Sequence, residues 1–194
     1  MAVALCTARA RELLGGLPER IEVLLSANIL KNAMGVGIPG TGMIGLPIAV
    51  ALGAQIGRSE YGLEVLRDVT PEAVARARDY LAADAVSVAL KEGISETLYV
   101  EVHCTAGGRR AEAVIAGSHT RFVYLACDGE VVLDRRTGAS SREEEPCVPL
   151  TLRRVFDYAL TAPIDELAFI DEARRLNMAA AELALGGEYG HSLG

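Results

Sequence analysis

Tryptophan is absent from this chain of 194 residues, and aromatic residues make up only 5% of it. Hydrophobic residues nevertheless account for 51% of the sequence, so alanine, leucine and valine must supply most of the packing. A chain of this length can bury a sizeable core, either as one domain or as two small ones.

An excess of basic residues is also missing, since 19 lysines and arginines face 26 aspartates and glutamates and give a net charge of −7. A nucleic-acid-binding surface needs a basic patch, so we expect no nucleic-acid partner. The longest run of like charge, Glu143–Glu145, is typical of a solvated loop.

Cysteines are few, and no two of them have CxxC spacing. Cys6, Cys104, Cys127 and Cys147 are widely separated, which does not suit a disulfide framework in a chain this long. The amino-terminus lacks the basic region, apolar stretch and cleavage site of a secretory signal. A reduced cytoplasm is the predicted location.

No apolar run is long and regular enough to predict a membrane span. Charged residues are absent between Lys31 and Arg58, but glycines and prolines interrupt this window. The part of it that is free of the glycine loop, Met43–Ile56, is shorter than the roughly 20 residues that a spanning helix needs. A buried core helix over about 44–57 is therefore predicted, and no membrane partner.

Residues 26–57 form the stretch on which the functional prediction depends. A polar cluster precedes a loop with four glycines, and the loop leads into the predicted core helix. Glycine amides and a helix N-terminus together can bind a carboxylate or phosphate. The alternative is a glycine loop that lets a buried helix pack closely. On the first interpretation the predicted substrate-binding residues are Ser26, Asn28, Gly37, Gly40, Thr41 and Gly42.

Local patterns predict the other elements of the first half. A helical period of apolar residues covers 2–14, and residues 20–25 alternate as a strand does. Thr70 and Pro71 begin a helix that continues through 72–82. The chain starts inside its first helix without a capping residue, which we interpret as a truncated start.

From residue 86 the hydrophobic period changes to two. Strands are predicted at 86–90, 98–104, 109–117, 121–127 and 130–134, and the Asp-Gly pair at 128–129 is a strong hairpin signal. These strands predict an α+β fold in which an antiparallel β-meander at about 86–134 packs with helices from both chain ends.

The remainder of the chain is polar and then helical. Residues 135–146 predict a linker, and 148–160 and 164–185 have helical period. We therefore divide the chain into a helical and glycine-loop segment with one strand (1–85), a β-meander (86–134) and a helical segment (147–194), and expect one compact fragment of a larger protein.

Several segments, in order, resemble one family. They are VALCTARARELLG (3–15), the stretch 26–54 with KNAMGVGIPGTG, SEYGLEVLRDVT (59–70), LYVEV (98–102) and VIAGSHTRFVYL (114–125). Together they resemble the amino-terminal half of the L-cysteine desulfidase family, which is related to the alpha chain of iron–sulfur L-serine dehydratases.

The resemblance implies a lyase that removes a β-substituent and ammonia from an L-amino acid and yields pyruvate. It also implies a 4Fe–4S cluster with an open iron site. Family members carry a cysteine in a Cys-Thr-Glu-Pro motif just before the segment that matches Val3, and the other expected cluster cysteines lie in a carboxy-terminal half that is absent here. The chain's own four cysteines do not match, so we predict no metal ligands and no activity of the chain alone.

The elimination needs groups that bind the α-carboxylate and a base that removes the α-proton. The glycine loop and Thr41 are predicted to bind the carboxylate. Lys31 and His119 are the candidate catalytic residues, Lys31 as a base if it is buried and His119 because it lies in the GSHT match. His103 is predicted to face solvent. In the alternative interpretation, Lys31 is exposed where the chain leaves a strand, and His119 is a structural residue of a turn.

Three hypotheses of function remain open. The chain is part of an amino-acid α,β-lyase acting on L-cysteine or L-serine, a non-catalytic module that binds a small carboxylate, or a structural half that docks another polypeptide. The predicted partners are a small amino-acid substrate and a missing carboxy-terminal half, a complementary subunit or a second copy.

Overall fold

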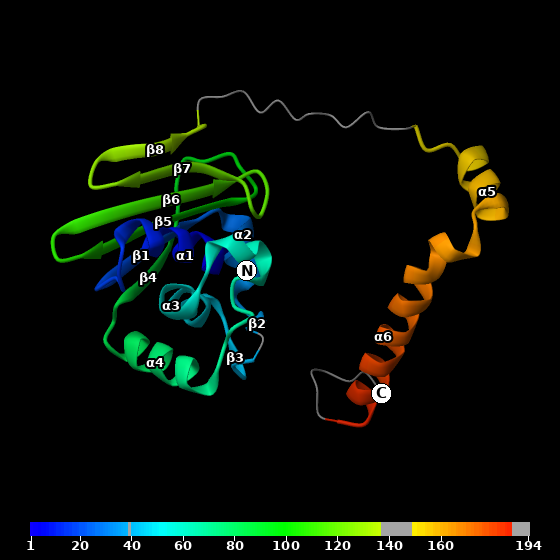
Figure 1. Ribbon diagram of the computed structural model, residues 1–194, viewed down its shortest axis with the longest axis horizontal. Helices are drawn as coiled ribbons and strands as arrows, with labels where there is room; N and C mark the ends of the chain where they lie inside the picture. Colours follow the sequence, from blue (N-terminus) through cyan, green and yellow to red (C-terminus); the bar gives the residue numbers. More distant parts are fainter. Residues whose placement is uncertain (39, 137–148, 188–194) are drawn as a thin grey trace. The chain divides into compact units, whose positions relative to one another are not determined.

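The computed structural model describes residues 1–38, 40–136 and 149–187, in two compact units, Met1–Ala139 and Ser140–Gly194. The first unit contains a six-stranded sheet with helices on one of its faces (Figure 1). The strand order is β4-β1-β5-β6-β7-β8. The strands are β1 (Arg20–Leu25), β4 (Val86–Leu90), β5 (Tyr99–Ala106), β6 (Arg109–Ala116), β7 (Phe122–Cys127) and β8 (Glu130–Asp134).

The predicted α+β class is confirmed, but the meander is shorter than 86–134. Strands β5 to β8 pair antiparallel in sequence order, whereas β4 pairs in parallel with β1, and β1 lies between β4 and β5. Parallel strands need a crossover connection of a dozen or more residues. The helical segment between β1 and β4 supplies it, so residues 86–90 join the far side of β1 instead of pairing with β5.

Two helices make the core with the sheet. Helix α1 (Ala2–Leu14) contacts β5, β6 and α3 (Leu46–Ile56), and α4 (Pro71–Ala82) packs on α3. Nine of the 13 residues of α1 and eight of the 11 residues of α3 are buried. Helix α3 is therefore the core helix that the uncharged window predicts. No helix among the described residues has both the length and the apolarity to cross a membrane.

Small residues bring α1 and α3 into close contact. A Cβ atom added at Gly53 would lie 2.6 Å from the carbonyl oxygen of Ala4, and one at Gly57 would lie 2.7 Å from the Cβ of Ala8. Both distances are too short for real atoms, so glycine at these two positions sets the separation of the helices.

Between β1 and α3 the chain forms two short elements that pattern alone does not reveal. Helix α2 (Ala27–Ala33) begins at Ser26, whose hydroxyl accepts a hydrogen bond from the amide of Ile29. Strands β2 (Gly37–Ile38) and β3 (Met43–Ile44) then form a hairpin. A 3₁₀ segment, η1 (Ser59–Glu64), follows α3.

The second unit is helical in its described residues. It consists of α5 (Leu152–Thr161), η2 (Ile164–Leu167) and α6 (Ala168–Leu185), and none of their residues is buried. The helical period predicts both helices. Their large exposed apolar side chains include Phe156, Leu160, Phe169, Leu176 and Leu183.

We expect Gly53→Val to lower the free energy of unfolding by about 2 kcal/mol, because the added carbons overpack the contact with Ala4. Gly16→Val is the matched control, since no atom lies within 4 Å of a Cβ at Gly16 and its φ angle is not left-handed. Urea unfolding followed by circular dichroism measures both. Equal stability of the two variants would contradict the close-contact interpretation.

Candidate functional site

The glycine loop is a hairpin in which the amides of Thr41, Met43 and Gly45 donate within the protein. The amide of Thr41 donates to the carbonyl of Ile38 at 3.2 Å, and the amide of Gly45 donates to Val36 at 3.0 Å. The Thr41 hydroxyl donates to Ile38 at 2.7 Å and accepts from the amide of Met43 at 3.0 Å. These groups of Thr41, Met43 and Gly45 are not available to a ligand. The carboxylate-binding role predicted for Gly37, Gly40 and Gly42 stays a prediction.

The glycines of the loop have backbone roles instead. Gly40 and Gly42 have φ angles of 75° and 63°, which favour glycine. A Cβ at Gly40 would also lie 2.5 Å from the Cγ1 of Val69. Gly37 pairs with Ile44 in the hairpin. Close packing in this loop is therefore present at Gly40, against Val69, and not at Gly37 or Gly42.

A pocket of about 230 Å³ lies at the first turn of α3. Gly45, the residue before the helix, provides no side-chain cap, and the first turn has no acidic residue. The positive end of the helix dipole is therefore not compensated by a carboxylate of the first turn. The pocket is lined by Met1, Ala2, Val3, Ile29, Asn32, Ala33, Val36, Ile38, Gly45, Leu46, Ala49 and His119.

His119 reaches this pocket from the turn between β6 and β7. The amide of Gly117 donates to the carbonyl of Leu98 at 3.0 Å, and the amide of Ala116 donates to Arg121 at 3.2 Å, so both sides of the turn are fixed. His119 is exposed as a residue, yet it is the histidine that lines the pocket. The structure thus brings it beside Asn32 and the amino-terminal end of α3.

The other predicted site residues lie outside this pocket. Ser26 is buried and structural, because its hydroxyl donates to the carbonyl of Thr97 at 2.9 Å and accepts from the amides of Ile29 and Tyr99. Asn28 accepts a hydrogen bond from Asn32 at 3.3 Å. Lys31 is exposed, so the burial that its proposed role as a base requires is not present.

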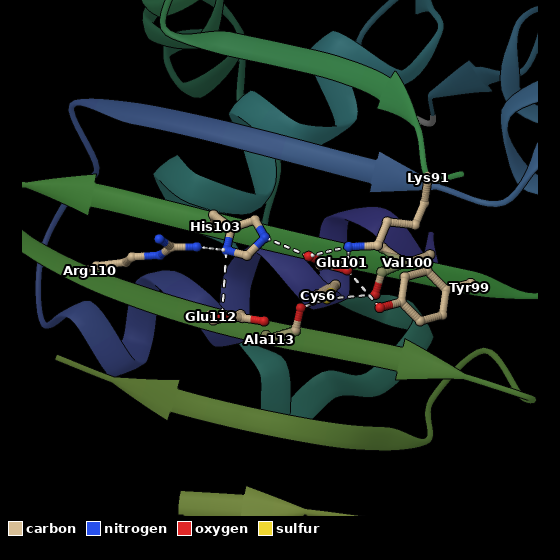
Figure 2. Close-up of polar contacts among 9 residues, drawn as sticks. All are labelled: Cys6, Lys91, Tyr99, Val100, Glu101, His103, Arg110, Glu112 and Ala113. Carbon is tan, nitrogen blue, oxygen red and sulfur yellow. Dashed lines mark hydrogen bonds and ion pairs between the residues drawn. The ribbon is translucent and has the colours of Figure 1, made fainter. Parts of the chain in front are cut away.

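A second polar cluster, which the sequence does not predict, lies on the sheet (Figure 2). Val100, Val102 and Cys104 of β5 are buried on the helix side. Because successive strand residues point to opposite faces, Glu101 and His103 belong to the other face. They are nevertheless only 5% and 8% exposed, so the prediction that His103 faces solvent is wrong.

Glu101 is the centre of this cluster and accepts three charged or polar donors. Lys91 lies 2.8 Å and the Tyr99 hydroxyl 2.6 Å from its Oε2, and the Nε2 of His103 lies 2.7 Å from its Oε1. The side chains of Lys91, Tyr99 and His103 cover the carboxylate. This explains why alternation alone misplaces His103.

The hydrogen bond with Arg110 determines which ring nitrogen of neutral His103 carries the proton. The guanidinium of Arg110 lies 2.8 Å from the Nδ1 of His103 and can only donate. Nδ1 must therefore accept, and in the neutral ring the proton is on Nε2, which donates to Glu101. Glu112 lies 3.6 Å from the same Nδ1.

The electrostatics of Glu101 reflect these partners. Burial alone would raise the pKa of Glu101, but hydrogen bonds from His103, Lys91 and Tyr99 together with the charge of Lys91 lower it to about 2. Burial and the adjacent Glu101 carboxylate raise the pKa of Tyr99. Glu101 is thus a permanent anion and Tyr99 a permanent donor near neutral pH.

Glu101, His103 and Glu112 also offer three ligand atoms within 4.8 Å of one another. A divalent cation would have to displace Lys91 from Glu101 and Arg110 from His103, both of which already balance the acidic charge. The donor set therefore fits a satisfied structural network better than a metal site, and we assign no metal to it.

The thiols of the described residues have structural environments. Cys6 is fully buried and donates to the carbonyl of Ala113 at 3.2 Å, and burial raises its pKa well above the usual value. Burial likewise raises the pKa of Cys104 to about 12. Neither cysteine lines the pocket at α3, in agreement with their predicted role as small buried side chains. Cys147 lies outside the described residues.

Comparisons with known proteins show similarity along the entire chain. A UPF0597 protein of Bacteroides thetaiotaomicron is 63% identical over 194 residues, which are 100% of this chain and 45% of that protein. UPF0597 proteins of Parabacteroides distasonis and Aeromonas hydrophila are 47% and 42% identical over 197 residues. No family model and no solved structure matches. The chain spans less than half the length of the curated relatives it matches.

We expect Glu101→Gln to lower the free energy of unfolding at neutral pH by roughly 2 kcal/mol, the range for hydrogen bonds to a charged group. The folded pKa of Glu101, about 2, lies below its ordinary value of 4.5. Its stabilisation is therefore fully present above about pH 4.5 and is lost as the pH falls towards about 2. Urea unfolding as a function of pH should show a smaller acid-range loss in the variant.

Glu22→Gln is the matched control for this measurement. Glu22 pairs with His103 across β1 and β5 but is exposed, and no ion pair of its carboxylate is present within 1–38, 40–136 and 149–187. Its substitution should leave both stability and acid dependence unchanged. A Glu101 variant that behaves like this control would show that the network does not stabilise the fold.

Alkylation by iodoacetamide should distinguish the cysteines. Cys6 and Cys104 should stay unmodified in the folded protein at about pH 8, because burial keeps both thiols protonated and covered. Both should react in denaturant, and peptide mass spectrometry identifies the modified positions. Rapid modification of either residue in the native protein would contradict the burial described here.

Proposed function

We propose that this chain is the substrate-binding part of an amino-acid α,β-elimination lyase, with L-cysteine the first candidate substrate and L-serine the second. One observation carries the proposal. The two most specific segments of the family resemblance, KNAMGVGIPGTG and GSHT, are far apart in the sequence, yet Asn32, Val36 and Ile38 of the first and His119 of the second line the same pocket.

The carboxylate of the substrate would bind at the amino-terminal end of α3, not in the hairpin. Leu46 opens the helix, and its amide has no partner within the helix. The uncompensated helix dipole favours a negative charge there. The pocket volume of about 230 Å³ suits a small amino acid, and Val3, Ile29 and Ala49 give it apolar walls.

Two side chains of the pocket have chemistry suited to the elimination. His119 can accept the α-proton or return a proton to the leaving group. The Asn32 amide can orient the substrate by hydrogen bonding. Removal of the α-proton and departure of the β-thiol leave an aminoacrylate, whose hydrolysis releases pyruvate and ammonia, so L-cysteine and water give pyruvate, sulfide and ammonia.

The family resemblance implies a 4Fe–4S cluster that would activate the leaving group. The described cysteines do not fit this group. Cys6 and Cys104 are buried away from the pocket with raised pKa values, and Cys127, which donates to the carbonyl of Leu13 at 3.3 Å, does not line the pocket either. We therefore derive no step through a cluster. The relatives are more than twice as long as this chain, and we propose that further polypeptide, as a continuation, a complementary subunit or a second copy, supplies the cluster in the cytoplasm.

A second candidate function is a module that binds a small carboxylate without turnover. The observation in its favour is that the pocket offers an anion-binding helix end and that none of the described cysteines lines it. A third, docking of another polypeptide, is favoured by the exposed apolar side chains of α5 and α6.

The test is anaerobic release of pyruvate and sulfide from L-cysteine, with iron, sulfide and the remaining polypeptide of a long relative supplied. We expect His119→Asn to lower kcat/KM by about 100-fold or more, the range for loss of a general acid or base. Lys31→Gln is the control, because Lys31 is exposed and does not line the pocket.

Three outcomes separate the candidate functions. Turnover that depends on His119 but not on Lys31 supports the lyase. Binding of L-cysteine in calorimetry without turnover favours the module. An equal loss in both variants, or turnover unaffected by His119→Asn, would show that the pocket at α3 is not the site of reaction.

A further inference from the structure

A larger pocket, of about 720 Å³, lies elsewhere in the first unit and has no part in the proposed elimination. Four segments contribute to it: α1, the beginning of η1, the β6–β7 turn with β7, and the end of β8. Its lining residues are Arg9, Glu12, Arg58, Ser59, Glu60, Thr120, Arg121, Phe122, Leu125, Leu133 and Arg135. This volume is in the range of small-molecule sites.

The pocket is basic in a protein that is acidic as a whole. It contains four arginines and two glutamates, whereas the chain has a net charge of −7. One glutamate is already engaged, since Glu12 accepts the amide and hydroxyl of Ser59 at 2.7 Å and 2.5 Å and the guanidinium of Arg9 at 3.3 Å. These bonds also fix Ser59 to α1.

The four arginines of the pocket differ in their side-chain partners. Arg58 donates to the hydroxyl of Tyr61 at 3.0 Å. Arg121 and Arg135, in contrast, make no side-chain hydrogen bond or ion pair with any residue that the structure describes. Their guanidinium groups are therefore available for a ligand.

The backbones that carry these two arginines are fixed. The carbonyl of Arg121 accepts the amide of Ala116 at 3.2 Å, and the amide of Arg135 donates to Val123 at 2.7 Å. Phe122, Leu125 and Leu133 add an apolar part of the lining between them. Charged forks at the ends of strands β7 and β8, beside apolar lining residues, match a ligand that has both an anionic and an apolar part.

We propose that this pocket binds a small organic phosphate, with Arg121 and Arg135 on the phosphate oxygens and Phe122 against the organic part. A guanidinium fork donates two parallel hydrogen bonds to a phosphate, and two forks match its double negative charge. The proposal does not depend on the lyase hypothesis, because none of these residues lines the pocket at α3.

The test is isothermal titration calorimetry of the full chain with AMP as the probe. AMP should bind, and affinity should fall with added salt. Arg121→Gln and Arg135→Gln should each weaken binding by about tenfold, and the double variant by about 100-fold, as expected for loss of hydrogen bonds to a charged group. Both residues are exposed, so the variants should keep the wild-type melting temperature.

Arg76→Gln is the matched control, since Arg76 is exposed on α4 and lies outside the pocket. It removes the same charge and should leave AMP binding unchanged. His119→Asn should also leave it unchanged, which separates this result from the outcome of the lyase test.

Inorganic pyrophosphate and citrate are the comparison ligands. Weaker binding of both than of AMP supports an organic phosphate site. Pyrophosphate binding as tight as AMP would overturn the role of the apolar surface, and tighter citrate binding would overturn the preference for phosphate. Absence of AMP binding, or binding that the double variant retains, would overturn the proposal as a whole.

Discussion

The close contact between α1 and α3 at Ala4 and Gly53 is the constraint on which the first unit depends. It lets α1 lie against both the sheet and α3, so nine of the 13 residues of α1 are buried. It also fixes the beginning of α3 beside the beginning of α1, where the 230 Å³ pocket forms. The candidate site is therefore a product of helix packing, and a side chain at Gly53 would disturb it from a distance.

Strand β5 has functionally different side chains on the two faces of the sheet. Its valines fill the core under the helices, while Glu101 and His103 organise a charged network on the other face (Figure 2). A buried carboxylate is tolerated there because three donors compensate the cost of removing it from water. None of the network residues Glu101, His103 and Lys91 lines either of the two pockets. The β6–β7 turn contributes to both pockets, with His119 in one and Arg121 in the other.

Local signals predicted the elements whose causes are local. Thr70 and Pro71 start α4 as expected, and the Asp128-Gly129 hairpin has positive φ angles at both residues. Helix α2 was missed because seven residues with a polar cluster carry little periodicity, and only the bonds of Ser26 to Ile29, Thr97 and Tyr99 explain its start. The glycine loop was recognised as special, but its hairpin pairing was not foreseen.

The sequence by itself determined the α+β class and the core helix after the glycine loop, because composition and short-range spacing encode them. His119 was selected by the family resemblance. Only the tertiary structure decided that β4 pairs with β1, that His103 is covered by its neighbours, and that Asn32 and His119 line one pocket while Lys31 does not. These facts depend on strand order and helix separation. Both arise from contacts between residues far apart in the chain, which no local pattern records.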